Sequence, residues 1–114
     1  MPATNKPPID IEPRHWAIVS DILCRHLPDT EVRAFGSRVT GRTKPYSDLD
    51  LLIMPRTPIS LRHLGLLQEA FSESELPWKV DLVDGSTISD TFRLAIVPQS
   101  IRIHPPEQTP FRPD

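Results

Sequence analysis

The stretch GSRVTGRTKPYSDLDLLI, residues 36–53, contains a Gly-Ser pair and, after ten intervening residues, an Asp-x-Asp that opens an apolar run. The four residues are Gly36, Ser37, Asp48 and Asp50. Each of these residue types occurs at about 5–7% in ordinary proteins, so chance places all four at this spacing in about one short chain in a thousand. VRAF precedes the pair and LDLLI carries the second Asp. The pattern therefore predicts a strand, a turn and a second strand.

The residue types in this stretch indicate a site for a metal–nucleotide. Side chains two apart on a strand point to the same face, so Asp48 and Asp50 present two carboxylates side by side. Hard oxygen ligands without Cys or His suit Mg²⁺ or Mn²⁺. Gly36 lets the backbone turn and lets a ligand approach closely. If a short helix starts at Ser37, its N–H groups form an anion site.

Simpler explanations exist for single residues of the motif. Ser37 is equally a common helix N-cap residue, and Ser47-Asp48 after Pro45 is a common turn sequence. The joint spacing, together with a third carboxylate further along the chain, favours a functional site over these separate explanations.

Length and composition bound the class of protein. The chain has 114 residues, 38% hydrophobic and 25% charged, with a net charge of -2, which predicts one small globular domain. The sequence has no basic stripe, which argues against binding to duplex nucleic acid. It has neither a membrane-spanning apolar run nor a signal peptide, so we expect no membrane association and a cytoplasmic location. Cys24 is alone, and its apolar neighbours predict a buried free thiol.

Fourteen prolines divide the chain into a domain and two tails. Their clustering at both ends predicts flexible segments at residues 1–8 and 104–114, around a domain at residues 9–103. Within this domain we first expect a helix from Pro13 to about Leu27, followed by strands over Glu31 to Phe35 and Leu49 to Met54. Next we expect a helix capped by Ser60, with Leu61, Leu64, Leu67 (or Gln68) and Phe71 on its apolar face, and a strand over Lys79 to Val83. The last elements are a helix that starts at Thr87 or Ser89 and is stopped by Pro98, and a short strand around Arg102.

This order predicts an α/β (α+β) fold, with a small mixed sheet and helices packed on one side. His15 and His26 lie outside the apolar stripe of the first helix, so we expect both to be solvated or capping residues.

Asp81 lies in the middle of the third predicted strand. Carboxylates are rarely buried there without a partner. One explanation is an edge strand with Asp81 in water. The other is that a central strand places Asp81 beside Asp48 and Asp50 as a third carboxylate.

The Gly36-Ser37 pair, the Asp48-x-Asp50 motif and the later Asp81 together resemble the nucleotidyltransferase domain of the DNA polymerase beta superfamily. GSRVTGR, YSDLDLLI and AFSESELPWKVDLVD are similar to the minimal nucleotidyltransferases of bacteria and archaea. The closest resemblance is to the catalytic chain of two-component nucleotidyltransferases, which is about this size.

The resemblance implies a role for each motif residue. Gly36 and Ser37 would hold the β- and γ-phosphates of a nucleotide. Asp48 and Asp50 would bind two Mg²⁺ ions, for which Mn²⁺ could substitute. Asp81 would bind the catalytic ion and help to deprotonate the attacking hydroxyl. A triphosphate and three Asp carry about seven negative charges, which two divalent cations about 3.5–4 Å apart can hold together.

Arg38 and Arg42 have two possible roles. They either neutralise charge on the leaving phosphates or are ordinary surface arginines. The sequence favours neither.

The resemblance also implies a partner, because the chain has no room for an acceptor-binding domain. In the family that partner is often a small all-helical protein of the HEPN type (higher eukaryotes and prokaryotes nucleotide-binding). Some such pairs are toxin–antitoxin systems in which AMP is added to a tyrosine of the toxin. We therefore expect AMP transfer from Mg-ATP to a protein hydroxyl (AMPylation). The alternatives are nucleotidyl transfer to a small molecule such as an aminoglycoside, and a non-catalytic antitoxin that only binds its partner.

Overall fold

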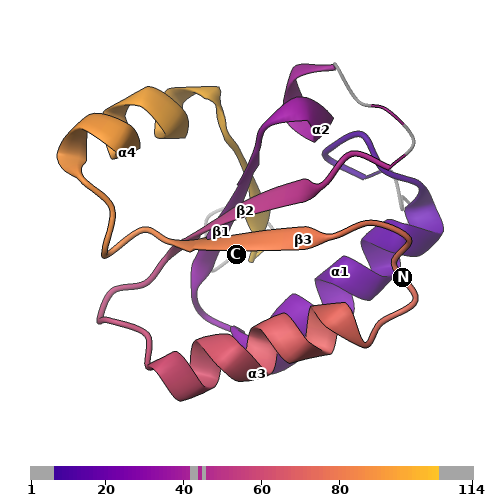
Figure 1. The fold of residues 1–114 in the computed structure, drawn as a ribbon, viewed down its shortest axis with the longest axis horizontal. Helices are drawn as coiled ribbons and strands as arrows, with labels where there is room; N and C mark the ends of the chain where they lie inside the picture. Colours follow the sequence, from indigo (N-terminus) through magenta and orange to yellow (C-terminus); the bar gives the residue numbers. More distant parts are fainter. Residues whose placement is uncertain (1–6, 42–43, 45, 106–114) are drawn as a thin grey trace, which may run out of the picture.

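The computed structural model describes residues 7–41, 44 and 46–105. The elements follow in chain order (Figure 1): α1 (Pro13–His26), β1 (Glu31–Phe35), α2 (Ser37–Thr40), β2 (Leu49–Met54), α3 (Leu61–Ser72), β3 (Val80–Asp84), α4 (Asp90–Ile96), the 3₁₀ helix η1 (Val97–Gln99) and β4 (Ile101–His104). The expected α/β class and every expected element are confirmed. The described residues contain no helix long and apolar enough to cross a membrane.

The four strands form one mixed sheet in the order β3-β2-β1-β4. β1 runs antiparallel to both β2 and β4, whereas β2 and β3 are parallel. Parallel neighbours need a crossover connection, and α3 supplies it. This order places β3 at an edge of the sheet, so of the two alternatives for the strand of Asp81 the edge strand is confirmed and the central strand is ruled out.

The core lies between one face of the sheet and the two longer helices. In Figure 1, α1 and α3 lie together below the strands, and α4 lies above them. The apolar residues that alternate along β1 and β2 face α1 and α3, as period-two alternation predicts. The fully buried members of this core are Val19, Leu23, Val32, Ala34, Leu49, Leu51, Ile53 and Leu67. None of the residues of α4 is buried.

Local signals set the helix ends. The side chain of Ser60 accepts a hydrogen bond from the backbone N–H of His63 at 3.0 Å, which caps α3 as expected. The side chain of Ser89 caps α4 through the N–H of Phe92. Gly41 ends α2 in the left-handed conformation.

Two expectations about α1 are wrong, although its apolar residues Val19, Ile22 and Leu23 form the buried face. His15 is buried, and its ring stands edge-on to Trp78 with 5.6 Å between the ring centroids. Cys24 follows the buried Leu23 but points to solvent, so its thiol is exposed.

Two further residues differ from expectation near element ends. Leu61, expected on the apolar face of α3, is 87% exposed because it is the first residue of that helix and precedes the packed turns. His104, expected to begin the C-terminal tail, is the buried last residue of β4, and its Nε2 lies 2.7 Å from the Leu27 carbonyl oxygen. The tails were expected at residues 1–8 and 104–114, and most of both, residues 1–6 and 106–114, lies outside the described residues.

Candidate active site

Gly36 forms the turn between β1 and α2 and touches the second carboxylate of the motif. Its φ of 86° and ψ of -158° lie in a region that only glycine adopts readily. A Cβ at this position would lie 2.3 Å from Oδ2 of Asp50. The contact follows from strand register, because Phe35, the last residue of β1, pairs with Asp50. The absence of a side chain at Gly36 is therefore what gives the Asp50 carboxylate its space.

Asp50 and Asp81 are paired residues on the neighbouring strands β2 and β3. Burial raises the pKa of Asp50, and the charges of Asp81 and Asp48 and a hydrogen bond with the Asp81 carboxyl raise it further. Asp48 is exposed and lies just before β2. Lys79 places its Nζ 3.5 Å from Oδ1 of Asp81. The structure thus concentrates negative charge at the start of β2, with one lysine beside it.

The position of Asp81 combines the two alternatives that the sequence left open. β3 is an edge strand, and the Asp81 side chain keeps 40% of its surface exposed. Register nevertheless places it directly beside Asp50. Asp81 can lie on an edge strand and still belong to the candidate site, because the only neighbour of β3 within the described sheet is β2, which carries Asp50.

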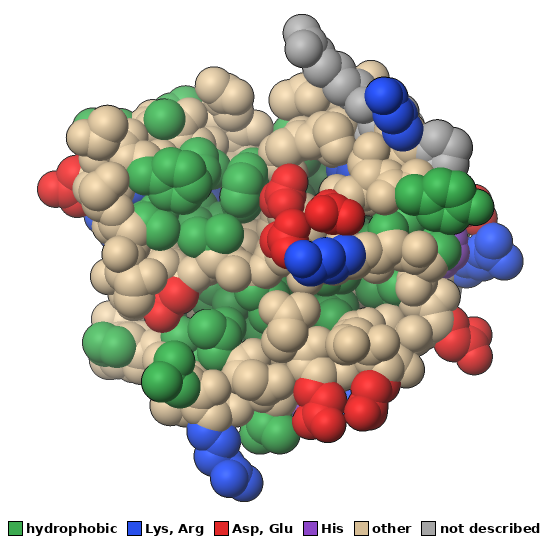
Figure 2. Space-filling model, viewed as in Figure 1, with side chains coloured by type: hydrophobic (Ala, Val, Ile, Leu, Met, Phe, Trp, Pro, Cys, Tyr) green, Lys and Arg blue, Asp and Glu red, His purple; other side chains and the backbone are tan. Residues whose placement is uncertain are grey.

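The predicted carboxylates lie near one another but do not form a complete set of metal ligands. Figure 2 shows acidic side chains near the middle of one face, with a basic side chain next to them. Within residues 7–41, 44 and 46–105, no three acidic, His or Cys side chains are arranged as a ready metal site. Like charges oppose such close approach until a cation neutralises them. The chemistry of the donors, oxygen atoms from carboxylates only, still fits a hard divalent ion.

Ser37 is the first residue of α2 and directly follows the Gly36 turn. It is half-buried. Ser37 therefore lies one residue after the glycine that approaches Asp50.

Arg38 is buried, at 5% exposure, so its interpretation as an ordinary surface arginine is wrong. Its Nε and Nη2 donate to the Ser47 carbonyl at 3.0 and 2.8 Å, and its Nη1 donates to the Asp10 carbonyl at 3.0 Å. The guanidinium carbon lies 4.4 Å from the centroid of the Trp78 ring. Burial lowers the pKa of Arg38, against the opposing effect of nearby Asp10 and Asp48. Arg42 lies outside the described residues.

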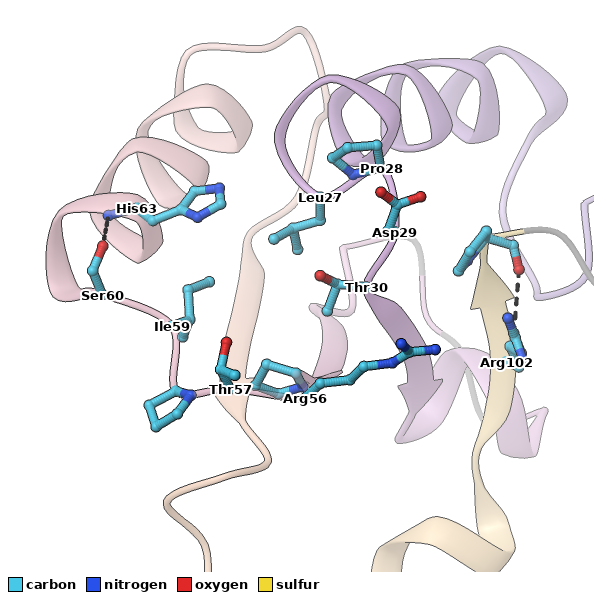
Figure 3. A pocket seen from close by; sticks show the side chains of 13 residues that line it. Leu27, Pro28, Asp29, Thr30, Arg56, Thr57, Ile59, Ser60, His63 and Arg102 are labelled. Atoms are coloured by element: carbon cyan, nitrogen blue, oxygen red, sulfur yellow. Dashed lines mark hydrogen bonds between the residues drawn. The ribbon is translucent and has the colours of Figure 1, made fainter.

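An open cavity of about 1100 Å³ lies elsewhere, beyond the far end of β2. Figure 3 shows it between the end of α1 at Leu27, the segment after β2 at Arg56, and Arg102 of β4. His63 borders it, with its Nε2 2.6 Å from the His26 carbonyl oxygen. None of the predicted site residues that the structure describes lines this cavity. The sequence did not indicate it, because segments distant in the chain form its walls.

Comparison with known proteins places these features in a family. The model of the nucleotidyltransferase domain family matches residues 17–105. A Haemophilus influenzae protein named probable protein adenylyltransferase MntA is 47% identical over 105 residues, which is 92% of each chain.

Two solved structures share the fold. One is a toxin–antitoxin with AMP-PNP, with a TM-score of 0.65 and 22% identity over 77% of this chain and 71% of that chain. The other is a tri-AMPylated Shewanella oneidensis HEPN toxin in complex with an MNT antitoxin, with a TM-score of 0.58 and 22% identity over 79% of this chain and 69% of that chain. The nucleotidyltransferase family generally uses divalent metal ions. The geometry of the carboxylates, the family match and the 47% identical relative agree, and the chain belongs to the nucleotidyltransferase domain family.

Proposed function

We propose that this protein transfers AMP from Mg-ATP to a hydroxyl group of a partner protein, and that Asp48, Asp50 and Asp81 carry the reaction. The observation that supports this most is the direct juxtaposition of the Gly36 turn, Asp50 and Asp81. A phosphate-binding turn against paired carboxylates is the arrangement that nucleotidyl transfer needs, because the reaction gathers many negative charges at one point. The name of the 47% identical relative, a probable protein adenylyltransferase, supports the same activity.

Each site residue has a distinct role in this proposal. Asp48 and Asp50 would hold two Mg²⁺ ions, or Mn²⁺, and Asp81 would share one of them. Gly36 and Ser37 would receive the β- and γ-phosphates, with the bare glycine allowing close approach. Divalent ions bound there supply charge neutralisation for the triphosphate and a lowered pKa for the acceptor hydroxyl. Asp81 would help to take up that proton, and the 40% of its side chain that is exposed leaves it accessible to an acceptor.

The openness of the site favours a protein acceptor over a small molecule. Asp48 is exposed, and Asp81 lies on an edge strand. An aminoglycoside would need a concave pocket that surrounds most of its surface. A protein can bring a single hydroxyl to an open surface and bury the surroundings itself. The acceptor in our proposal is therefore a tyrosine of a HEPN-type partner, in a cytoplasmic toxin–antitoxin pair.

Isotope transfer tests the reaction class. The protein, a HEPN-type partner, Mg²⁺ and ATP labelled at either the α- or the γ-phosphate are incubated together, and the partner is then isolated. Nucleotidyl transfer moves only the α-label to the partner, whereas kinase activity would move only the γ-label. A labelled aminoglycoside in a parallel incubation would instead support the small-molecule alternative. Partner binding without any label transfer would support the non-catalytic alternative.

A further inference from the structure

Arg38 connects segments that are distant in the sequence. Two of its nitrogens donate to one carbonyl, that of Ser47, at 3.0 and 2.8 Å, and a third donates to the Asp10 carbonyl at 3.0 Å. Its guanidinium also lies over the Trp78 ring, 4.4 Å from the centroid. The backbone completes the connection, because the Asp10 N–H donates to the Arg38 carbonyl at 2.9 Å.

Three of these segments lead directly into the candidate active site. Arg38 itself is two residues after Gly36. Ser47 is the residue before Asp48, and Trp78 stands three residues before Asp81. A single buried side chain, two residues from the Gly36 turn, therefore contacts the segment that precedes Asp48 and the segment that precedes Asp81.

We propose that Arg38 is a positioning residue. It holds Asp48 and Asp81 in place relative to the Gly36 turn, so that these two carboxylates and Asp50 can bind metal ions together. This inference rests on the proposed function. Without an ion, the negative charges of the three carboxylates repel one another. Asp48 is the most exposed of them and lies outside the strand. Two hydrogen bonds on the preceding carbonyl restrain the segment that carries it.

The arrangement requires a guanidinium rather than any cation. Two donors from one planar group converge on the Ser47 carbonyl while the face of the group stacks on Trp78. Lysine carries a single compact ammonium, so it cannot donate two hydrogen bonds to the Ser47 carbonyl and stack on the Trp78 ring at the same time. Arg38→Lys should therefore keep more metal affinity than Arg38→Gln, but less than the wild-type protein.

Binding of Mn²⁺ tests this inference independently of catalysis. Mn²⁺ affinity is measured by electron paramagnetic resonance in the presence of AMP-PNP and without a partner protein, so that no acceptor is present, for wild type, Arg38→Gln, Arg38→Lys and Arg33→Gln. Arg33 is the matched control because it is a half-buried arginine that also makes several hydrogen bonds: its Nη1 donates to Glu31 at 2.8 Å and its Nε donates to Ser100. Residues that orient metal ligands typically contribute 10–100-fold to metal affinity. We expect about a tenfold loss in Arg38→Gln, a smaller loss in Arg38→Lys and less than a twofold change in Arg33→Gln.

The outcomes separate this inference from the proposed function. Wild-type Mn²⁺ affinity in a folded Arg38→Gln protein would overturn the inference, as would an equal loss in Arg33→Gln. If Arg38→Gln does not fold, Arg38→Lys decides: unchanged Mn²⁺ affinity in that variant overturns the inference, and a clear loss supports it. Metal binding that depends on Arg38 in a protein that transfers no AMP would refute the proposed function and leave the inference standing. A wild-type protein that binds no Mn²⁺ with AMP-PNP would refute the inference.

Discussion

Replacing Gly36 with alanine should disable the site far more than it destabilises the domain. The new Cβ would lie 2.3 Å from Oδ2 and 3.3 Å from Cγ of Asp50, so the carboxylate or the turn must shift by about 1 Å to reach the ordinary van der Waals separation. The backbone at φ 86° and ψ -158° adds about 1–3 kcal/mol of strain for a residue with a side chain. A displacement of this size at a reacting group can cost about 10²-fold in rate.

Gly41→Ala is the matched control for this substitution. Gly41 also has a positive φ, 83°, but a Cβ there meets nothing within 4 Å. Its left-handed conformation alone costs an L-residue about 1–2 kcal/mol. Urea unfolding should therefore show comparable losses of stability in the two variants, while AMP transfer falls about 100-fold in Gly36→Ala and stays near wild type in Gly41→Ala. Normal transfer by a folded Gly36→Ala protein, or an equal loss in Gly41→Ala, would refute the reasoning.

Three further substitutions test the electrostatics and the helices. The pKa of Asp50 is raised in the folded state. Its contribution to the free energy of unfolding is therefore complete below the pKa of an unfolded Asp, near 4, and is lost as pH rises through the raised pKa. Asp50→Asn should remove this loss and stabilise the protein at pH 7 in EDTA, and identical pH profiles of urea unfolding would contradict the account. Gly65 is exposed within α3, and a Cβ there meets nothing within 4 Å, so Gly65→Ala should add about 0.5–1 kcal/mol and raise Tm by about 4 °C; a lower Tm would show that the space is not free. Ser60→Ala removes the cap on the His63 N–H and should cost about 1 kcal/mol in urea unfolding, whereas no loss would mean that the cap adds nothing.

Local patterns in the sequence predicted most of the fold. The alternation from Glu31 to Phe35 and the dense apolar run from Leu49 to Met54 match β1 and β2 residue for residue. Capping residues such as Ser60 set helix ends because their effect depends only on the next few residues. Strand order could not be predicted from local patterns, because strand pairing depends on the whole chain. The edge position of β3 could not be read from the alternation around Asp81.

Side chains that contact backbone atoms far along the chain were the hardest to predict. Arg38 binds the carbonyl groups of Ser47 and Asp10, and a carbonyl carries no residue-specific signal. His15 is buried because Trp78, distant in sequence, packs against it. The Gly-Ser and Asp-x-Asp spacing could be recognised because the chemistry fixes both the residue types and the turn between them. Its contact between Gly36 and Asp50 then follows from the register of β1 and β2.

Intact mass of the HEPN-type partner, after incubation with this protein, Mg²⁺ and ATP, tests the central claim most directly. Asp48→Asn is the decisive control, because Asp48 is exposed and its replacement should leave the fold intact. The account predicts that the partner gains whole AMP units with the wild-type protein and none with Asp48→Asn. An equal gain with the variant, or no gain while the two proteins form a tight complex, would contradict it.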